Sequence, residues 1–396
     1  MKRYIYNKYI FIITYLSGLL VPYLYLLFLK NMKFFFIKKI YKNKIILFLF
    51  FFLFIQLIST FLSVFSNYNS DMIRYIAIYH NYMNFLFLIF GIIWLQNSYN
   101  FIKYQFRESI RITYIFIIIV SILSFIYSLN TGNTVNYEGI LSKITGVSNA
   151  YTQVNINSVG FLDNSIFPRT RLFGIYSNSA AVVIFIISII YLIEYVNSIK
   201  TKFIFIIITL IVLATTGSRI TIISFIIWSY FYIHRSRKQL FISLFIIFIV
   251  ILMFYNNILN IFSYINNLRD DSSNTRFHLY LVSLSLMINE NILFGLGLKP
   301  KLELIKELPI GSHSTLIGYF VKNGIIGGLY FLIGYIFIIY KFILSLFSYH
   351  YTKKIYYKFA VFSLSIIFIF EDLDAYEFVA FLSGILIYFA YIKQRS

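Results

Sequence analysis

A histidine and several arginines are the residues of this chain with the clearest potential for chemistry. His313 lies in the run Gly311–Ser312–His313–Ser314, whose small side chains leave the imidazole accessible. A neutral imidazole has an unperturbed pKa of about 6.5, so it can accept a proton at working pH. His313 is therefore a candidate general base. The alternative is an incidental histidine beside a helix N-cap, where Ser312 or Ser314 is the capping residue.

Arg219 ends the tight turn Thr216–Gly217–Ser218–Arg219 between two apolar segments. A cation at a short turn between membrane helices is costly unless it has a partner. Guanidinium suits bidentate recognition of phosphate or carboxylate. The turn therefore predicts an anionic ligand, such as a lipid-linked pyrophosphate. In the alternative interpretation, Arg219 extends to the membrane interface or pairs with an acid such as Asp372.

Four further arginines lie in segments that are otherwise poor in arginine. Arg169 and Arg171 precede an apolar segment, and Arg269 and Arg276 lie in a long polar one. The acidic run 371–374 is a further candidate. It could bind a metal ion or sugar hydroxyls, or it could be a solvated turn. The chain has no cysteine and no zinc-like ligand spacing. We therefore expect neither a structural metal nor a cofactor.

The composition indicates where these residues must work. The chain has 396 residues, of which 60% are apolar and 12% charged, with a mean hydropathy of +0.80. A soluble domain is about 45–50% apolar and about 25% charged, so a soluble enzyme, a disordered regulator and a fibrous protein are excluded. A net charge of +20 suggests nucleic acid in a soluble protein. Here we expect a polytopic membrane protein whose partner is the lipid bilayer, not nucleic acid.

Eleven apolar segments predict membrane-spanning helices, because backbone groups in lipid must be satisfied within each segment. The segments are Tyr9–Leu29, Ile45–Phe65, Met72–Leu95, Ile112–Leu129, Leu172–Val196, Phe203–Thr215, Ile220–Ile233, Leu240–Tyr255, Gly324–Phe347, Tyr357–Phe370 and Ala375–Tyr391. If the first is a hairpin broken near Pro22, the number is twelve.

Charge predicts the sidedness of these helices through the positive-inside rule. Basic residues cluster in one alternate set of loops, at 30–44, 103–111, 200–202, 235–238, 353–358 and 393–395. The other set holds twelve of the fourteen acids: Asp71, Glu138, Asp163, Asp270, Asp271, Glu290, Glu303, Glu307, Glu371, Asp372, Asp374 and Glu377. We place the basic loops in the cytoplasm. Eleven spans then put the basic N-terminus outside, whereas twelve put it inside.

We expect one integral membrane domain, 1–396, with two long extracytoplasmic loops. The first is 130–170. The second, 256–322, is the main loop, and its stretch Arg276–Ile288 reads as an amphipathic helix. Gly295–Leu296–Gly297 is expected to be a turn, because no βαβ unit surrounds it. Gly324-x-x-x-Gly328 is expected to be a small-residue face for helix packing.

Three blocks of this sequence, in order, resemble the O-antigen polymerase and O-antigen ligase family. They are RLFGIYSNSAAVV, then ATTGSRITIISF, then ENILFGLGL followed by GSHSTLIGYFVKNGIIGGLYFL. The resemblance covers Arg171 to about Leu332. Three residues depart from the family pattern: Ser179 replaces a Pro-Asn pair, Ile220 a glycine and Ser314 an asparagine.

The resemblance implies a bundle of 11–12 transmembrane helices of the GT-C-like type. It implies a metal-independent glycosyltransferase, multi-pass in the bacterial cytoplasmic membrane, whose active site faces the extracytoplasmic side. The implied substrate is an oligosaccharide linked to undecaprenyl pyrophosphate, and the implied protein partners are a chain-length regulator and a flippase. By position, Arg219, Arg276 and His313 correspond to the family's turn arginine, loop arginine and loop histidine, and Arg171 to the arginine that precedes a span.

These roles agree with the chemistry of glycosyl transfer. An attacking hydroxyl must lose a proton, and His313 is the predicted base. The charge of the leaving diphosphate must be met, and Arg219 and Arg276 are predicted to meet it. Arg171, Arg169 and Asp372 are predicted to bind pyrophosphate or sugar. The leading interpretation is a repeat-unit polymerase for O-antigen, capsule or exopolysaccharide.

Two other functions stay open. One is a ligase that transfers finished glycan to a lipid A core or to a protein. The other is a flippase or permease for the lipid-linked unit. A flippase should have broken helices, repeated halves and charges inside its spans. In this sequence no internal repeat is evident, and the charges lie at the outer ends of the predicted spans.

We expect His313→Ala and Arg219→Ala each to abolish polymer while the protein still inserts and accumulates. General-base catalysis raises the rate by about 10²–10⁴. Losing a phosphate clamp should cost at least as much rate as losing one oxyanion donor, which is about 10²–10³. Arg219→Lys should fail too, because an ammonium cannot replace a bidentate fork. Gel analysis of the glycan, beside a blot for the protein, measures this. Near-normal polymer length in a variant removes that residue from the mechanism.

Overall fold

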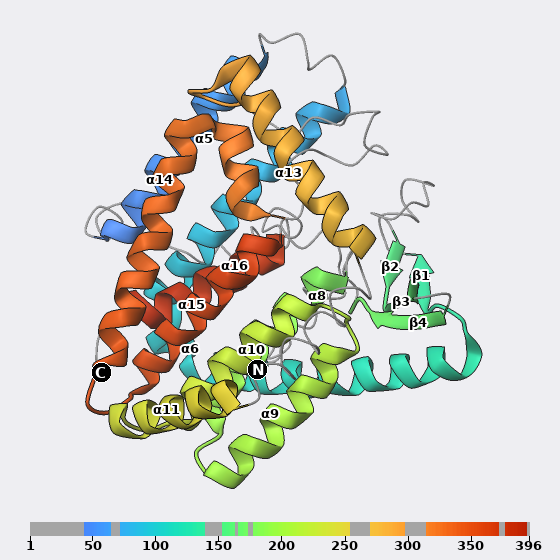
Figure 1. Ribbon diagram of the computed structural model, residues 1–396, viewed down its shortest axis with the longest axis vertical. Helices are drawn as coiled ribbons and strands as arrows, with labels where there is room; N and C mark the ends of the chain where they lie inside the picture. The colour runs from blue at the N-terminus through green and yellow to red at the C-terminus, as the bar shows by residue number, and fades with distance from the viewer. Residues whose placement is uncertain are drawn as a thin grey trace. The chain divides into compact units, whose positions relative to one another are not determined.

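The computed structural model describes residues 43–64, 72–138, 153–162, 165–172, 177–253, 270–297, 314–371 and 377–393. Helices dominate these ranges, which confirms the predicted all-α polytopic membrane fold (Figure 1). The helices are α5 Lys44–Val64, α6 Met72–Thr131, α8 Ser177–Tyr195, α9 Ile199–Ala214, α10 Arg219–Ile233, α11 Arg237–Met253, α13 Asp270–Asn291, α14 Thr315–Leu346, α15 Lys353–Phe370 and α16 Glu377–Ile387, which runs into the π-helix η4 Tyr388–Ile392. The first predicted span, Tyr9–Leu29, lies outside the described residues.

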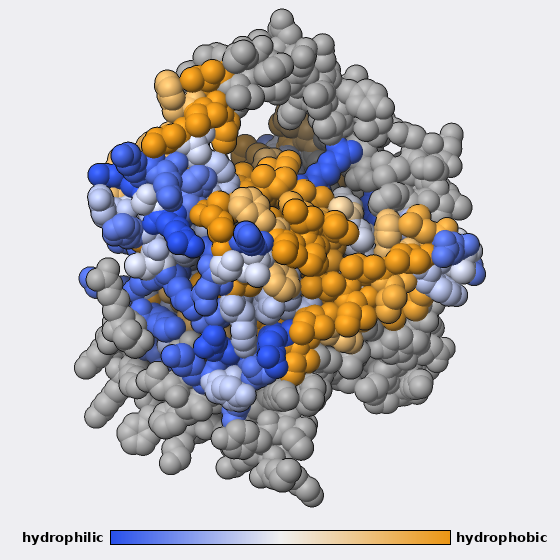
Figure 2. Space-filling model, turned by 90° about the horizontal axis from the view of Figure 1, so that it is seen from below, coloured by the Kyte–Doolittle hydropathy of each residue, from blue (hydrophilic) through white to orange (hydrophobic). Residues whose placement is uncertain are grey.

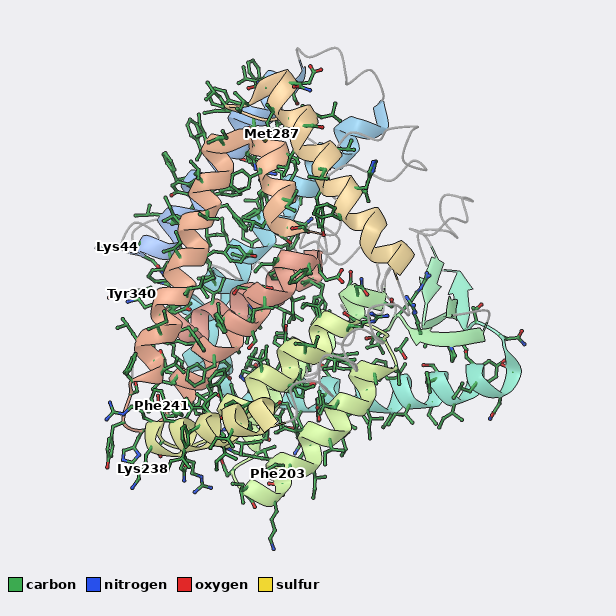
Figure 3. The ribbon with its side chains drawn as sticks, in the orientation of Figure 1. Lys44, Phe203, Lys238, Phe241, Met287 and Tyr340 are labelled. Carbon is green, nitrogen blue, oxygen red and sulfur yellow. The ribbon has the colours of Figure 1, made fainter. Side chains whose placement is uncertain are left out.

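Apolar side chains cover much of the surface of these helices. Within the described residues, four segments are long and apolar enough to cross a membrane: Lys44–Ser63, Lys103–Thr131, Ser177–Tyr195 and Thr315–Leu346. Phe203, Phe241 and Tyr340 are exposed and point away from the helices that carry them (Figure 3). Figure 2 shows broad hydrophobic areas beside hydrophilic ones on the described surface. Exposed apolar side chains are what lipid as a solvent requires.

The segment predicted as two spans and a basic loop is instead one continuous helix. The spans at 72–95 and 112–129 both belong to α6, a helix of 60 residues. The residues between the two apolar stretches include no Gly or Pro, and Lys, Arg, Gln and Glu are good helix formers. Their charges also find partners, since Arg111 pairs with Glu108 at 2.7 Å. The prediction of a loop at 103–111 was therefore wrong.

Two short antiparallel hairpins lie in the first long loop, where the sequence predicted only a polar segment. Strand β1 Asn136–Glu138 pairs with β2 Gln153–Asn155. Strand β3 Asn157–Leu162 pairs with β4 Ser165–Thr170, with Asn157 opposite Thr170 and Leu162 opposite Ser165. Hairpins satisfy the backbone of a segment that has no helical apolar pattern. Strand β4 matters most, because it carries Arg169.

Contacts divide the chain into two compact units. Unit 1 comprises Met1–Leu49, Met83–Ser229 and Leu373–Ser396, and unit 2 comprises Phe50–Tyr82 and Tyr230–Asp372. In unit 1, α8 is buried almost throughout from Ser179 to Glu194, as expected of a helix that is apolar on all sides. Also in unit 1, α6 and α16 cross closely at Gly91 and Gly384, where an added Cβ would meet the backbone of the facing helix.

In unit 2, α14 is broken at Gly324, which has φ 62° and ψ −163°. The break separates a short arm, 315–323, from a long arm, 325–346, and the two arms pack on each other (Figure 1). The rings of Tyr319 and Phe331, one from each arm, have centroids 4.4 Å apart. Gly324 was expected to be part of a flat packing face. Only Gly328 has that role, since an added Cβ there would meet the ring of Phe320.

The turn after α13 satisfies the backbone groups that this break exposes. Leu296 and Gly297 donate their N–H groups to the carbonyls of Val321 and Lys322, each at 2.8 Å. In return, Ile325 and Ile326 donate theirs to carbonyls at the end of α13, Ile292 at 2.9 Å and Leu293 at 3.2 Å. The predicted turn Gly295–Leu296–Gly297 is confirmed, and its partner in the fold is the broken helix.

Some of the basic segments that the charge pattern places in the cytoplasm have hydrogen-bond partners within their own unit. In unit 1, Arg107 of α6 donates to the carbonyl of Glu194 at the end of α8, at 2.9 Å. In unit 2, the two basic loops pair, with Tyr351 donating its N–H to the carbonyl of Arg235 at 3.0 Å. Arg237 also donates to the carbonyl of Phe347. In unit 2, these bonds bring the segments around 235–237 and 347–351 together; the sidedness of the helices stays a prediction.

Gly324→Ala should destabilise the protein far more than Gly132→Ala. Both glycines have positive φ, 62° and 67°, and a left-handed backbone costs a residue with a Cβ about 1–2 kcal/mol. At Gly324 the new Cβ would also meet the carbonyl of Leu293, whereas at Gly132 it meets nothing within 4 Å. The yield and Tm of detergent-extracted protein measure the difference. Equal losses in the two variants would mean that the contact at the break is unimportant.

Candidate functional site

The turn between α9 and α10 is built to leave Arg219 exposed at a helix start. Gly217 has φ 69°, a left-handed conformation that reverses the chain. Ser218 precedes the helix, and its buried hydroxyl bonds that of Thr221 at 2.9 Å. Arg219 is then the first residue of α10, and its side chain is exposed. The predicted turn is confirmed.

Strand β4 brings a second guanidinium to this turn. The N–H of Thr170, the last residue of β4, donates to the carbonyl of Thr215 at 2.9 Å. Next to it, the side chain of Arg169 passes over Gly217. A Cβ at Gly217 would lie 3.3 Å from Nε and 3.5 Å from Cδ of Arg169. Gly217 therefore has two roles: its backbone conformation reverses the chain, and its lack of a Cβ leaves room for the side chain of Arg169.

Arg169 is held in an environment that disfavours its charge. Burial, and then the positive charge of Arg219, lower the pKa of Arg169 from its ordinary value. Its Nε is buried and donates to no acceptor in the described part of the chain. An unsatisfied buried donor costs about 1–3 kcal/mol. An anion at Arg169 would provide the missing acceptor for its Nε and would offset the repulsion between the two guanidinium groups.

The start of α10 adds to this preference for anions. The first N–H groups of a helix have no partner within it, and the helix dipole places partial positive charge there. A phosphate oxygen is a common ligand for such an end. Two guanidinium groups and a helix start from separate parts of unit 1 therefore make the turn at 215–219 a candidate anion site.

The other predicted residues fall in several places. Arg171 is half-buried and follows β4, where its N–H donates to the carbonyl of Ile156 at 2.8 Å. Arg276 lies on α13 in unit 2, and only its backbone belongs to the described residues. His313, Asp372 and Arg269 lie outside the described residues. Their predicted roles stay predictions.

The helix that begins beside His313 is capped by a serine. Ser314 is the N-cap of α14, and its hydroxyl oxygen accepts from the N–H of Ile317 at 3.2 Å. The suggested cap at Ser314 is confirmed. Thr315 fixes the same helix start, because its N–H and its hydroxyl both donate to the carbonyl of Glu371, at 3.1 and 2.7 Å.

The described ranges contain no group of three His, Asp or Glu side chains that could hold a metal ion. They do contain neighbours of the candidate site that the sequence reasoning missed, namely Thr170, Thr215 and the Gly217 contact with Arg169. A threonine pair 45 residues apart has no signature in sequence. Gly217, inside the Thr-Gly-Ser-Arg turn, was the one signal that pointed towards it.

Comparison with known protein families gives one match. Residues 204–332 fit the family model described as O-antigen ligase. This stretch is similar to that family, and the rest of the chain lies outside the match. The match confirms the predicted resemblance and supports a function of the O-antigen ligase or polymerase type. No curated protein matches the chain.

The matched stretch, 204–332, covers some of the predicted site residues and not others. It includes Arg219, Arg276 and His313, the three residues with predicted catalytic roles. It excludes Arg169 and Arg171, which precede it, and Asp372, which follows it. Arg169, the guanidinium that lies near Arg219 in the structure, therefore comes from outside the matched stretch.

Arg169→Met should make the substrate-free protein more stable. The change removes a buried unsatisfied donor and a repulsion between like charges, and methionine keeps the apolar part of the side chain. Relief of about 1–3 kcal/mol should raise Tm by a few degrees. The measurement is thermal unfolding of detergent-purified protein without added anions.

Arg107→Met is the matched control for this change. Arg107 pairs with the buried carboxylate of Glu194, at 3.9 Å, and donates to its carbonyl. Removing it takes a favourable cation away from a buried acid, so Tm should fall. A fall in Tm for Arg169→Met as well would show that Arg169 is structural and contradict the site.

Proposed function

We propose that this protein is a membrane glycosyltransferase that polymerises oligosaccharide repeat units carried on a lipid pyrophosphate. The observation that carries the proposal is the pair of guanidinium groups at the 215–219 turn, Arg169 and Arg219. The match of residues 204–332 to the O-antigen ligase family model supports the reaction class. The long apolar helices support a site at a membrane, where a lipid-linked donor is found.

In the proposed reaction, a hydroxyl of the acceptor sugar attacks the anomeric carbon of the donor. The bond between that carbon and the diphosphate oxygen breaks, and its electron pair leaves with the lipid diphosphate. Arg219 and Arg169 hold the diphosphate and stabilise the charge that develops on it. Charge stabilisation by groups already in place is commonly the largest catalytic term. In this proposal the two guanidinium groups do the work that a divalent metal does in other transferases.

The proton of the attacking hydroxyl needs a base, and His313 is the candidate. Its role comes into the proposal from the chemistry of an accessible imidazole and from the family resemblance. Arg276, as a further diphosphate ligand, and Arg171, as a candidate pyrophosphate ligand, come from the resemblance, and Asp372 is kept as a candidate sugar ligand because it belongs to the acidic run 371–374. The extracytoplasmic position of the reaction follows from the predicted charge sidedness.

The second candidate is transfer of a finished glycan, because the matched family is described as O-antigen ligase. Both reactions use the same donor chemistry and differ in the acceptor. The diphosphate site at Arg169 and Arg219 fits either one. The acceptor therefore decides between them.

A strain that lacks this gene should accumulate glycan capped with a single repeat unit. A polymerase joins repeat units, so its loss leaves the later transfer step with monomers only. Gel separation of the surface glycan and of the lipid-linked pool measures this. Free lipid-linked polymer would instead identify a ligase. Repeat units that face the cytoplasm would identify a flippase and overturn the proposal.

A further inference from the structure

Two buried threonines fasten strand β4 to the turn that carries Arg219. The hydroxyl of Thr170 donates to that of Thr215 at 2.8 Å, beside the backbone bond between the same residues. Thr170 is fully buried and Thr215 is 5% exposed. The hydroxyl of Thr215 in turn donates to the carbonyl of Val212 at 2.7 Å. Because Thr215 has a single hydroxyl hydrogen, Thr170 must supply the one between them.

This pair of bonds lies between two groups that repel each other. Arg169 directly precedes Thr170, and Arg219 follows Thr215 by four residues, with Gly217 between them under the Arg169 side chain. Like charges separate when nothing holds them, and a strand end joined by one backbone bond can move away from a turn. The second bond, between the hydroxyls, resists that movement.

We propose that Thr170 and Thr215 are positioning residues that hold Arg169 over the Arg219 turn before the substrate arrives. The inference rests on the proposed diphosphate-binding function of the two arginines. Neither threonine needs to touch the substrate. Their effect is preorganisation: the folding of unit 1 holds the guanidinium groups together, so binding does not have to assemble them.

Loss of the hydroxyl bond should therefore weaken anion binding through Arg169. The probe is inorganic pyrophosphate, and the readout is the rise in Tm that it causes in the full-length, detergent-purified protein. The concentration dependence of that rise gives the dissociation constant for pyrophosphate. We expect it to be roughly tenfold higher in Thr170→Val than in the wild type, which corresponds to the loss of about one hydrogen bond. Thr170→Ser keeps the hydroxyl and should restore the binding.

The matched control is Thr113→Val. Thr113 is equally buried in unit 1, and its hydroxyl bonds only the carbonyl of Ser109 in its own helix, at 2.7 Å. This variant should lose stability as a buried threonine does, and should keep the affinity of the wild type for pyrophosphate. If Thr170→Val does not accumulate, Thr170→Ala removes the same hydroxyl without introducing a second methyl group.

A double-mutant cycle separates positioning from general stability. If Thr170 acts through Arg169, then Thr170→Val should weaken binding in the wild type and have no further effect in Arg169→Met. Equal effects in both backgrounds would overturn the inference, and so would wild-type affinity in Thr170→Val. If pyrophosphate does not stabilise the wild type, or stabilises Arg219→Ala equally, the proposed diphosphate site itself fails.

Discussion

The need to satisfy backbone hydrogen bonds without water is the constraint on which this fold depends. In hydrocarbon each unpaired N–H or C=O is costly, so the chain can depart from a helix only where another part of the protein provides the partner. At Gly324 the turn after α13 provides both donors and acceptors. At the 215–219 turn the end of β4 provides the donor for the Thr215 carbonyl. At both of these places, the irregular backbone is hydrogen-bonded to a second segment of the chain.

At the 215–219 turn, in contrast, a buried side-chain donor lacks an acceptor among the described residues. Arg169 has a buried Nε with no acceptor in the described part of the chain, and it lies close to a like charge. The proposed diphosphate ligand would give this donor an acceptor, and the match of residues 204–332 to the O-antigen ligase family model is the reason for proposing a diphosphate.

The sequence allowed the main features to be predicted, and physical reasons explain the rest. Apolar runs predicted α5, α8, α9, α10, α11, α15 and α16, and the Thr-Gly-Ser-Arg motif predicted the turn at Arg219, because these are local properties. The continuity of α6 was missed, since its charged middle resembles a loop until Arg107 and Arg111 find their partners. The break at Gly324 and the contact of Arg169 with the turn depend on segments far away in sequence. Hydropathy carries no information about such contacts.

The short arm of α14 has a mechanical consequence for the chain around it. Its nine residues, 315–323, span about 14 Å. Its first residue is bound to the carbonyl of Glu371 and its last carbonyls are bound to Leu296 and Gly297. Gly297 and Ser314 therefore lie near opposite tips of one strut. The described fold sets the distance between them, so any change in the length of the chain that joins them must still span about 14 Å.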